Sequence, residues 1–219
     1  MSSFLKGLWS RTRKEPESRG LDHPRDLQKG DMLQLANHFG LPEILRDKMF
    51  KVIAVSTYQF EHENDTNFTL ESVGDKKLGL SIESNEGRDI AVFSYTINPR
   101  VVEELFDLDE FAEVFDSDDA VTLNTRSNAE FDDWTAPQYF QEVKGEKAYY
   151  YGRDYRPSGP PVHEGEGELF EYFLLVNKEN SHGVEIEVFA GGETEVALIR
   201  YVDLEMISGL WPASQAAGK

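Results

Sequence analysis

The sequence contains no cysteine. This absence excludes disulfide bonds, zinc–thiolate sites, iron–sulfur clusters and cysteine nucleophiles, and it fits a reducing compartment. Long apolar runs are missing as well, since no stretch approaches the roughly 18 residues that span a bilayer. Lys6 and Gly7 interrupt the apolar residues near the N-terminus, which is not the pattern of a signal peptide. We therefore expect a cytoplasmic protein.

Basic residues are also scarce. The chain has 22 Lys and Arg against 41 Asp and Glu, which gives a net charge of −19. The first thirty residues have the opposite balance, with seven basic residues and four acidic ones. A body this acidic repels phosphates, so we expect no nucleic-acid partner.

These charges suggest three regions. Residues 1–26 are expected to be a basic arm and linker, 27–206 a single body or two subdomains meeting near 98–120, and 207–219 a C-terminal tail. If residues 1–15 form a helix, Phe4, Leu8 and Trp9 lie on one side and the basic residues on the other. Such a helix suits an anionic membrane surface or a groove on a partner, and the alternative is a frayed terminus.

Within the body, β-branched and aromatic residues recur in short runs separated by polar turns. This pattern predicts antiparallel hairpins and meanders. The predicted strands are Phe50–Phe60, Phe68–Val73, Leu78–Ile82, Ile90–Tyr95, Ala120–Leu123, Ala148–Tyr151, Leu169–Val176, Val184–Phe189 and Glu195–Tyr201.

One central segment has helical spacing instead. Apolar residues between Pro99 and Phe115 recur at intervals of three and four, and the intervening positions are mostly acidic. The predicted fold class is therefore α+β, mainly antiparallel sheet with one central helical segment. The acids from Asp107 to Asp119 include no glycine, so they do not fit a calcium-binding loop. We interpret them as the solvated face of a helix, or alternatively as a docking site for a basic partner.

The sequence shows no pattern typical of catalysis. Its five histidines are scattered without metal-ligand spacing, and no nucleophile or phosphate-binding motif is present. We predict no catalytic residue, metal or cofactor, and whether the chain is an enzyme stays open.

The densest aromatic cluster is the best candidate binding surface on the body. If Tyr149, Tyr150 and Tyr151 form a strand, the first and third share one face and Tyr150 lies on the other. One face is expected in the core, and the other could form an interface together with Arg153 and Tyr155.

Three segments carry a resemblance. Leu27–Asp31, the run from Phe50 to Tyr58, and Leu204 to Pro212 resemble the bacterial YjfK-like family, whose function is unknown. The resemblance implies no catalytic residues. It does imply a gene neighbourhood with a phage-shock-protein-A-like membrane-stress protein and a small multi-pass membrane protein, and hence a cytoplasmic accessory protein at the inner membrane.

Two functions are consistent with these patterns. The first is a non-enzymatic interaction protein whose acidic body binds a protein partner, such as a phage-shock-protein-A-like protein, while the arm contacts anionic membrane. The alternative is a small-molecule binder or enzyme with a carboxylate and tyrosine pocket in the body. A deep cavity with convergent carboxylates of shifted pKa would favour the alternative.

Overall fold

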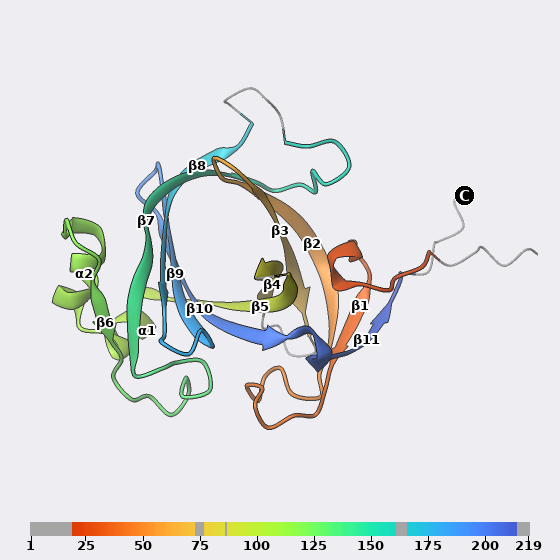
Figure 1. Ribbon diagram of the computed structural model, residues 1–219, viewed down its shortest axis with the longest axis horizontal. Coiled ribbons are helices and arrows are strands. Elements are labelled where there is room, and N and C mark those ends of the chain that lie inside the picture. Colours follow the sequence, from red (N-terminus) through yellow and green to blue (C-terminus); the bar gives the residue numbers. More distant parts are fainter. Residues whose placement is uncertain (1–18, 73–76, 86, 161–165, 214–219) are drawn as a thin grey trace, which may run out of the picture.

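The computed structural model describes residues 19–72, 77–85, 87–160 and 166–213 (Figure 1). Within these ranges eleven strands form one antiparallel sheet. The prediction of a mainly antiparallel, β-rich fold is thereby confirmed. The strands are β1 (Met32–Leu35), β2 (Met49–Gln59), β3 (Asn64–Glu71), β4 (Lys77–Asn85), β5 (Arg88–Ile97), β6 (Thr122–Asn124), β7 (Gln138–Tyr151), β8 (Glu168–Val176), β9 (His182–Phe189), β10 (Thr194–Asp203) and β11 (Ile207–Trp211).

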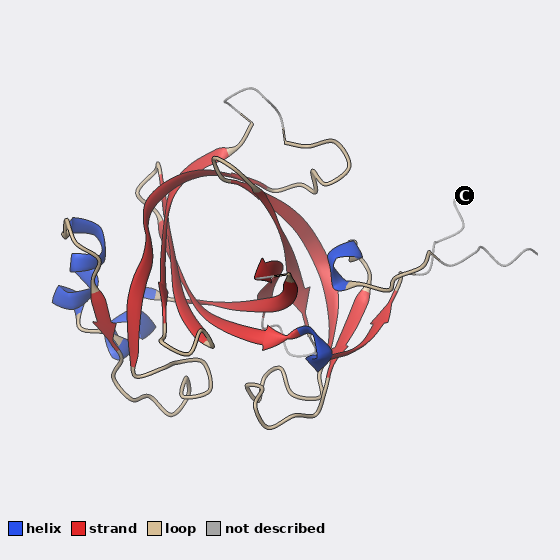
Figure 2. Ribbon diagram, in the orientation of Figure 1, coloured by secondary structure: helices blue, strands red, loops and turns tan. Residues whose placement is uncertain are grey.

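The sheet closes on itself. Its strand order is β11-β1-β2-β3-β4-β5-β10-β9-β8-β7-β6, and β2 also pairs with β7, where Tyr58 lies opposite Tyr150. Eight strands, from β2 round to β7, therefore form a complete ring, which both ribbon views show (Figures 1 and 2). Strands β1 and β11 extend the sheet outside this ring on one side, and β6 extends it on the opposite side.

The outer face of the ring carries the apolar core. The Phe115 ring of helix α2 packs at 5.1 Å from the ring of Phe173 on β8, and Trp134 packs against Tyr95 of β5. Because α2 lies outside the ring, Phe173 points outward (Figure 2). Its neighbours on the same face, among them Ile186 and Leu198, are fully buried beneath the helices and loops. The core thus forms an outer layer, and the opposite face of every ring strand points into the enclosed space, here called the lumen.

The central helical segment is two helices rather than one. Helix α1 spans Pro99–Leu105 and helix α2 spans Leu108–Asp116, and they are separated by Phe106 and Asp107. The Asp107 carboxylate accepts a hydrogen bond from the Asp109 amide, so it caps a new helix where the sequence pattern predicted continuity. Neither α1 nor α2, the α-helices of the described residues, has the length and apolar character that a bilayer crossing requires. Two short 3-10 helices, Pro24–Asp26 and Leu204–Met206, complete the elements.

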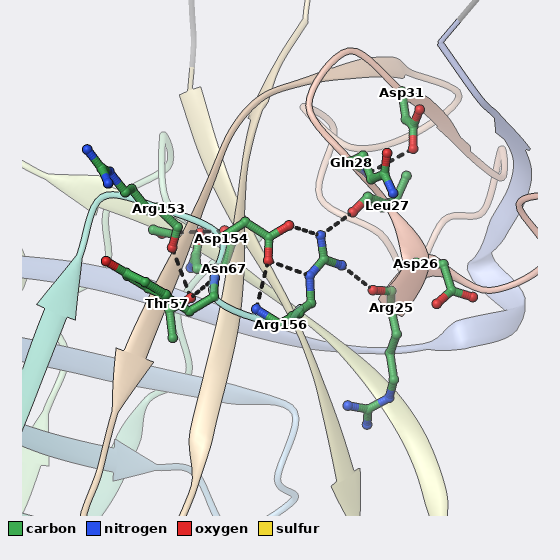
Figure 3. A network of polar contacts seen from close by, with 12 residues as sticks. Arg25, Asp26, Leu27, Gln28, Asp31, Thr57, Asn67, Arg153, Asp154 and Arg156 are labelled. Carbon is green, nitrogen blue, oxygen red and sulfur yellow. Dashed lines mark hydrogen bonds and ion pairs between the residues drawn. The ribbon is translucent and has the colours of Figure 1, made fainter. Parts of the chain in front are cut away.

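The segment from residue 19 to β1 lies against the outside of the ring, where Arg156 holds it (Figure 3). The Arg156 guanidinium donates to the backbone carbonyls of Arg25 and Leu27, at 2.7 Å for the latter. It also pairs with the Asp154 carboxylate and lies 5.1 Å above the Phe68 ring. Residues 19–26, which the sequence assigned to the arm and linker, and Ile207–Trp211, which it assigned to the tail, are therefore structured parts of the described chain.

Candidate functional site

The lumen contains a cavity of about 350 Å³ at one end of the ring. All eight ring strands contribute to its walls, which only the inner face of a closed sheet can bring about. Hydroxyl and amide side chains from β2, β3 and β5 supply hydrogen-bonding groups, namely Ser56, Asn67, Thr69, Ser94 and Thr96. The space is open partly because Gly79 of β4 faces Ser94 without a side chain.

Acidic side chains line this first cavity. Glu187 of β9 and Glu195 of β10 point into it, and Glu168 and Glu193 join them in its lining. Glu187 is only 7 % exposed, and the Tyr58 hydroxyl is its hydrogen-bond donor. Burial, reinforced by the charges of Glu185 and Glu195, raises the pKa of Glu187.

Aromatic rings form the wall where β2, β7 and β8 meet. The Tyr58 ring lies 5.2 Å from that of Tyr150 and 5.7 Å from that of Phe170. Phe170 in turn lies 5.6 Å from Phe189 at the end of β9. The first cavity therefore has carboxylates on one part of its wall and ring faces on another.

A second cavity of about 420 Å³ lies at the opposite end, beside the β2–β3 and β4–β5 turns. Asp65 of β3 and Glu83 of β4 line it, together with Tyr172 of β8. Burial raises the pKa of Asp65 to about 6, with help from Glu63, and that of Glu83 to about 7, with help from Asp65.

Glu185 of β9 links the two ends. It points to the same face as Glu187, two positions away, and the Tyr172 hydroxyl is hydrogen-bonded to it. Burial is the main cause of its raised pKa, and the charges of Glu83 and Asp65, which line the second cavity, add to it.

Counter-charges are few along this row of carboxylates. Within the part of the chain that the structure describes, none of Asp65, Glu83, Glu185, Glu187 and Glu195 forms an ion pair with Lys or Arg. Lys77 lines the first cavity, and Arg25 lines the second, where its guanidinium is already paired with Asp89. Hydrogen bonds from the Arg25 and Ser84 side chains, together with the Arg25 charge, hold the pKa of Asp89 well below its usual range.

The predicted tyrosine cluster is divided between two faces, as strand alternation requires. Tyr150 lines the first cavity, whereas Tyr149 and Tyr151 lie together on the other face beside Gly167. Tyr151 is buried, donates to the Gln59 side chain and packs against Tyr155 at 5.3 Å. Arg153 is exposed, and its carbonyl accepts a hydrogen bond from Thr57. Phe4, Leu8 and Trp9 lie outside the described residues.

The lumen carboxylates were not among the residues singled out from the sequence. Val184-Glu185-Ile186-Glu187-Val188 alternates between apolar and acidic residues, which indicates a strand with one wet face. Alternation alone does not distinguish a face toward bulk water from a face toward a lumen. Among the described residues, no three His, Asp or Glu side chains are grouped so that they could hold a metal ion. On the outside of the ring, the acids of the predicted helix face, such as Glu103, Asp109 and Glu113, are exposed.

Comparisons of the chain with protein-family models, with curated proteins and with solved structures give no match. The resemblance to the YjfK-like family therefore stays an expectation, and the lumen is the feature from which a function can be inferred.

Proposed function

We propose that the protein binds a small organic cation inside the lumen of its closed sheet. The observation that carries this proposal is the buried carboxylate of Glu187, which faces a cavity and has no ion pair with Lys or Arg among the described residues. A buried carboxylate is costly unless it is paired, and a bound cation would supply the missing charge.

The aromatic wall favours an organic cation over a bare ion. Ring faces attract ammonium groups, especially where water is excluded, and the apolar ring surface packs against methylene groups. Tyr58, Tyr150 and Phe170 offer such surfaces within the same cavity as Glu187 or beside it. A cavity of about 350 Å³ is in the range of small-ligand sites.

Of the two functions that the sequence left open, this proposal develops the small-molecule binder. It assigns no reaction, and it treats the lumen carboxylates as ligand-binding groups. The interaction with a phage-shock-protein-A-like partner and the membrane contact of the arm stay predictions, since the arm's Phe4, Leu8 and Trp9 lie outside the described residues.

Calorimetric titration of the full chain at pH 8 tests the proposal with three probes of one size: butylammonium, butanol and butyrate. We expect heat of binding for butylammonium alone, because only this probe carries a positive charge that can pair with the Glu187 carboxylate. We also expect Glu187→Gln to weaken butylammonium binding at least roughly tenfold, since it removes one charge of a buried pair.

Glu113→Gln is the matched control, because it makes the same chemical change at an exposed position on α2. Its affinity for butylammonium is expected to equal that of the unmodified chain. Equal binding of butanol and butylammonium would contradict the selection of a cation, and no binding of any probe would contradict the proposed site.

A further inference from the structure

The carboxylates of the lumen extend along its length rather than gathering at one point. Glu195 and Glu187 belong to the first cavity, whereas Glu83 and Asp65 belong to the second, at the other end of the ring. Glu185 stands between the two groups, because it interacts electrostatically with Glu187 on one side and with Glu83 and Asp65 on the other. The carboxylates therefore form a row from one cavity to the other, with Glu185 of β9 between the two groups.

The spacing of this row is set by strand geometry. Glu185 and Glu187 occupy successive positions on one face of β9, and such positions are about 7 Å apart along a strand. A chain of roughly four methylene groups separates two ammonium groups by a similar distance. A ligand with one charge could pair with the carboxylates at one end of the row and would leave those at the other end without a bound cation.

The lumen walls suit an extended, flexible ligand. The aromatic rings continue from Tyr58 and Phe170 to the second cavity, where the Phe60 ring lies 5.3 Å from that of Tyr172. Methylene groups between two charges would pass along this wall while the carboxylates face the charges. Of these carboxylates, Glu187 has the most restricted position, since it is buried and the Tyr58 hydroxyl donates a hydrogen bond to it.

We propose that the ligand is a linear diamine or longer polyamine. One ammonium group lies between Glu187 and Glu195, and a second lies toward Glu185 and Glu83. This inference rests on the proposed function and makes it specific, because it requires at least two positive charges joined by an apolar chain.

Titration with 1,4-diaminobutane, in parallel with butylammonium, tests the inference on the full chain at pH 8. The two probes have the same carbon chain and differ by one ammonium group. We expect the diamine to bind at least roughly tenfold more tightly, because its second charge meets the second group of carboxylates. Both Glu187→Gln and Glu83→Gln are expected to reduce this ratio, whereas Glu113→Gln leaves it unchanged.

The outcomes separate the two proposals. Equal affinities for the monoamine and the diamine would overturn the inference and leave the proposed cation site standing. Absence of binding by either probe would overturn both. Diamine binding that is the same in Glu187→Gln, Glu83→Gln and the unmodified chain would place the ligand outside the lumen and also overturn the inference. Glutamine matches glutamate in size and resembles its protonated form, so we expect each variant to keep the sheet, and circular dichroism of each variant tests this.

Discussion

At the scale of single residues, the distinctive feature is a row of carboxylates that face the lumen, of which Glu187 is the most buried. Burial disfavours their charged form, so each of them holds its proton to a higher pH than it would in water. Glu83 and Asp65 have pKa values of about 7 and about 6, and the pKa of Glu187 is raised as well. Proton uptake and ligand binding therefore compete for the same oxygens.

This competition gives a pH dependence of stability. Unfolded glutamates titrate near pH 4.3, whereas the pKa of Glu83 in the folded protein is about 7. Between these values the folded state binds protons that the unfolded state has released, so the free energy of unfolding falls as pH rises through this window. We expect urea denaturation to give a lower free energy of unfolding at pH 8 than at pH 5.

Glu187→Gln isolates the largest single contribution to this pH dependence, because the pKa of Glu187 is raised more than that of the other lumen carboxylates. Because glutamine carries no charge at any pH, this variant should be more stable than the unmodified chain at pH 8, by on the order of 1–3 kcal/mol, and should differ little at pH 5. Glu113→Gln, at an exposed position, should follow the unmodified chain at both values. A Glu187→Gln variant that is destabilised at pH 8 would show that the ionised carboxylate has a stabilising partner.

At the scale of elements, the sequence patterns predict the positions of the central strands better than those of the helices and of the strands at the edges of the sheet. The predicted ranges of β5, β9 and β10 agree with the structure to within a few residues. Alternation marks β9, whereas runs of β-branched and aromatic residues mark β5 and β10, and both faces of β10 carry buried apolar side chains. For β7 the sequence pattern predicts only the last residues, Ala148–Tyr151. The pairing of β7 with β8 is irregular between Gln141 and Glu146, and this irregularity shifts the alternation along the strand.

The break between α1 and α2 shows a related limit of prediction from apolar spacing. Apolar spacing runs continuously from Val101 to Phe115, yet the helix stops at Leu105 and a second one begins at Leu108. The Asp107 side chain caps the second helix locally, and a tertiary contact adds to this, since Arg126 donates to the Phe106 carbonyl and pairs with Asp107. No local signal in the sequence records that contact, which comes from a residue 20 positions away.

The attachment of the N-terminal segment to the ring can be tested at Arg156. Its side chain is 27 % exposed and joins the Arg25 and Leu27 carbonyls to Asp154 and the Phe68 ring. We expect Arg156→Ala to lower the free energy of unfolding by on the order of 2 kcal/mol, measured by urea denaturation. Arg153→Ala is the matched control, because this neighbouring arginine is exposed and takes part through its backbone, and its change should stay within about 0.5 kcal/mol.

At the scale of the whole molecule, the sequence predicted many of the strands and not their closure. The pairing of β2 with β7 places Thr57 opposite Tyr151, and nothing in the sequence of either strand indicates that the two are partners. The candidate site depends on that closure, because it places one face of eight strands around a single space. The tyrosine cluster was found from its composition, whereas the role of Tyr150 in the lumen could be assigned only from the closed sheet.

The pairing of β1 with β11 has a consequence for the rate at which the chain folds. The Ser208 hydroxyl donates to the Gln34 carbonyl across 174 positions of sequence, and β11 pairs with β1 over the same stretch. Contacts between such distant segments must wait for most of the chain to be in place, and sheets rich in them fold slowly. We expect refolding after dilution from urea to take on the order of a second or longer, as followed by tryptophan fluorescence, and a submillisecond phase that recovers the full signal would contradict this. On the ribosome, the same geometry keeps the sheet incomplete until β11 has emerged.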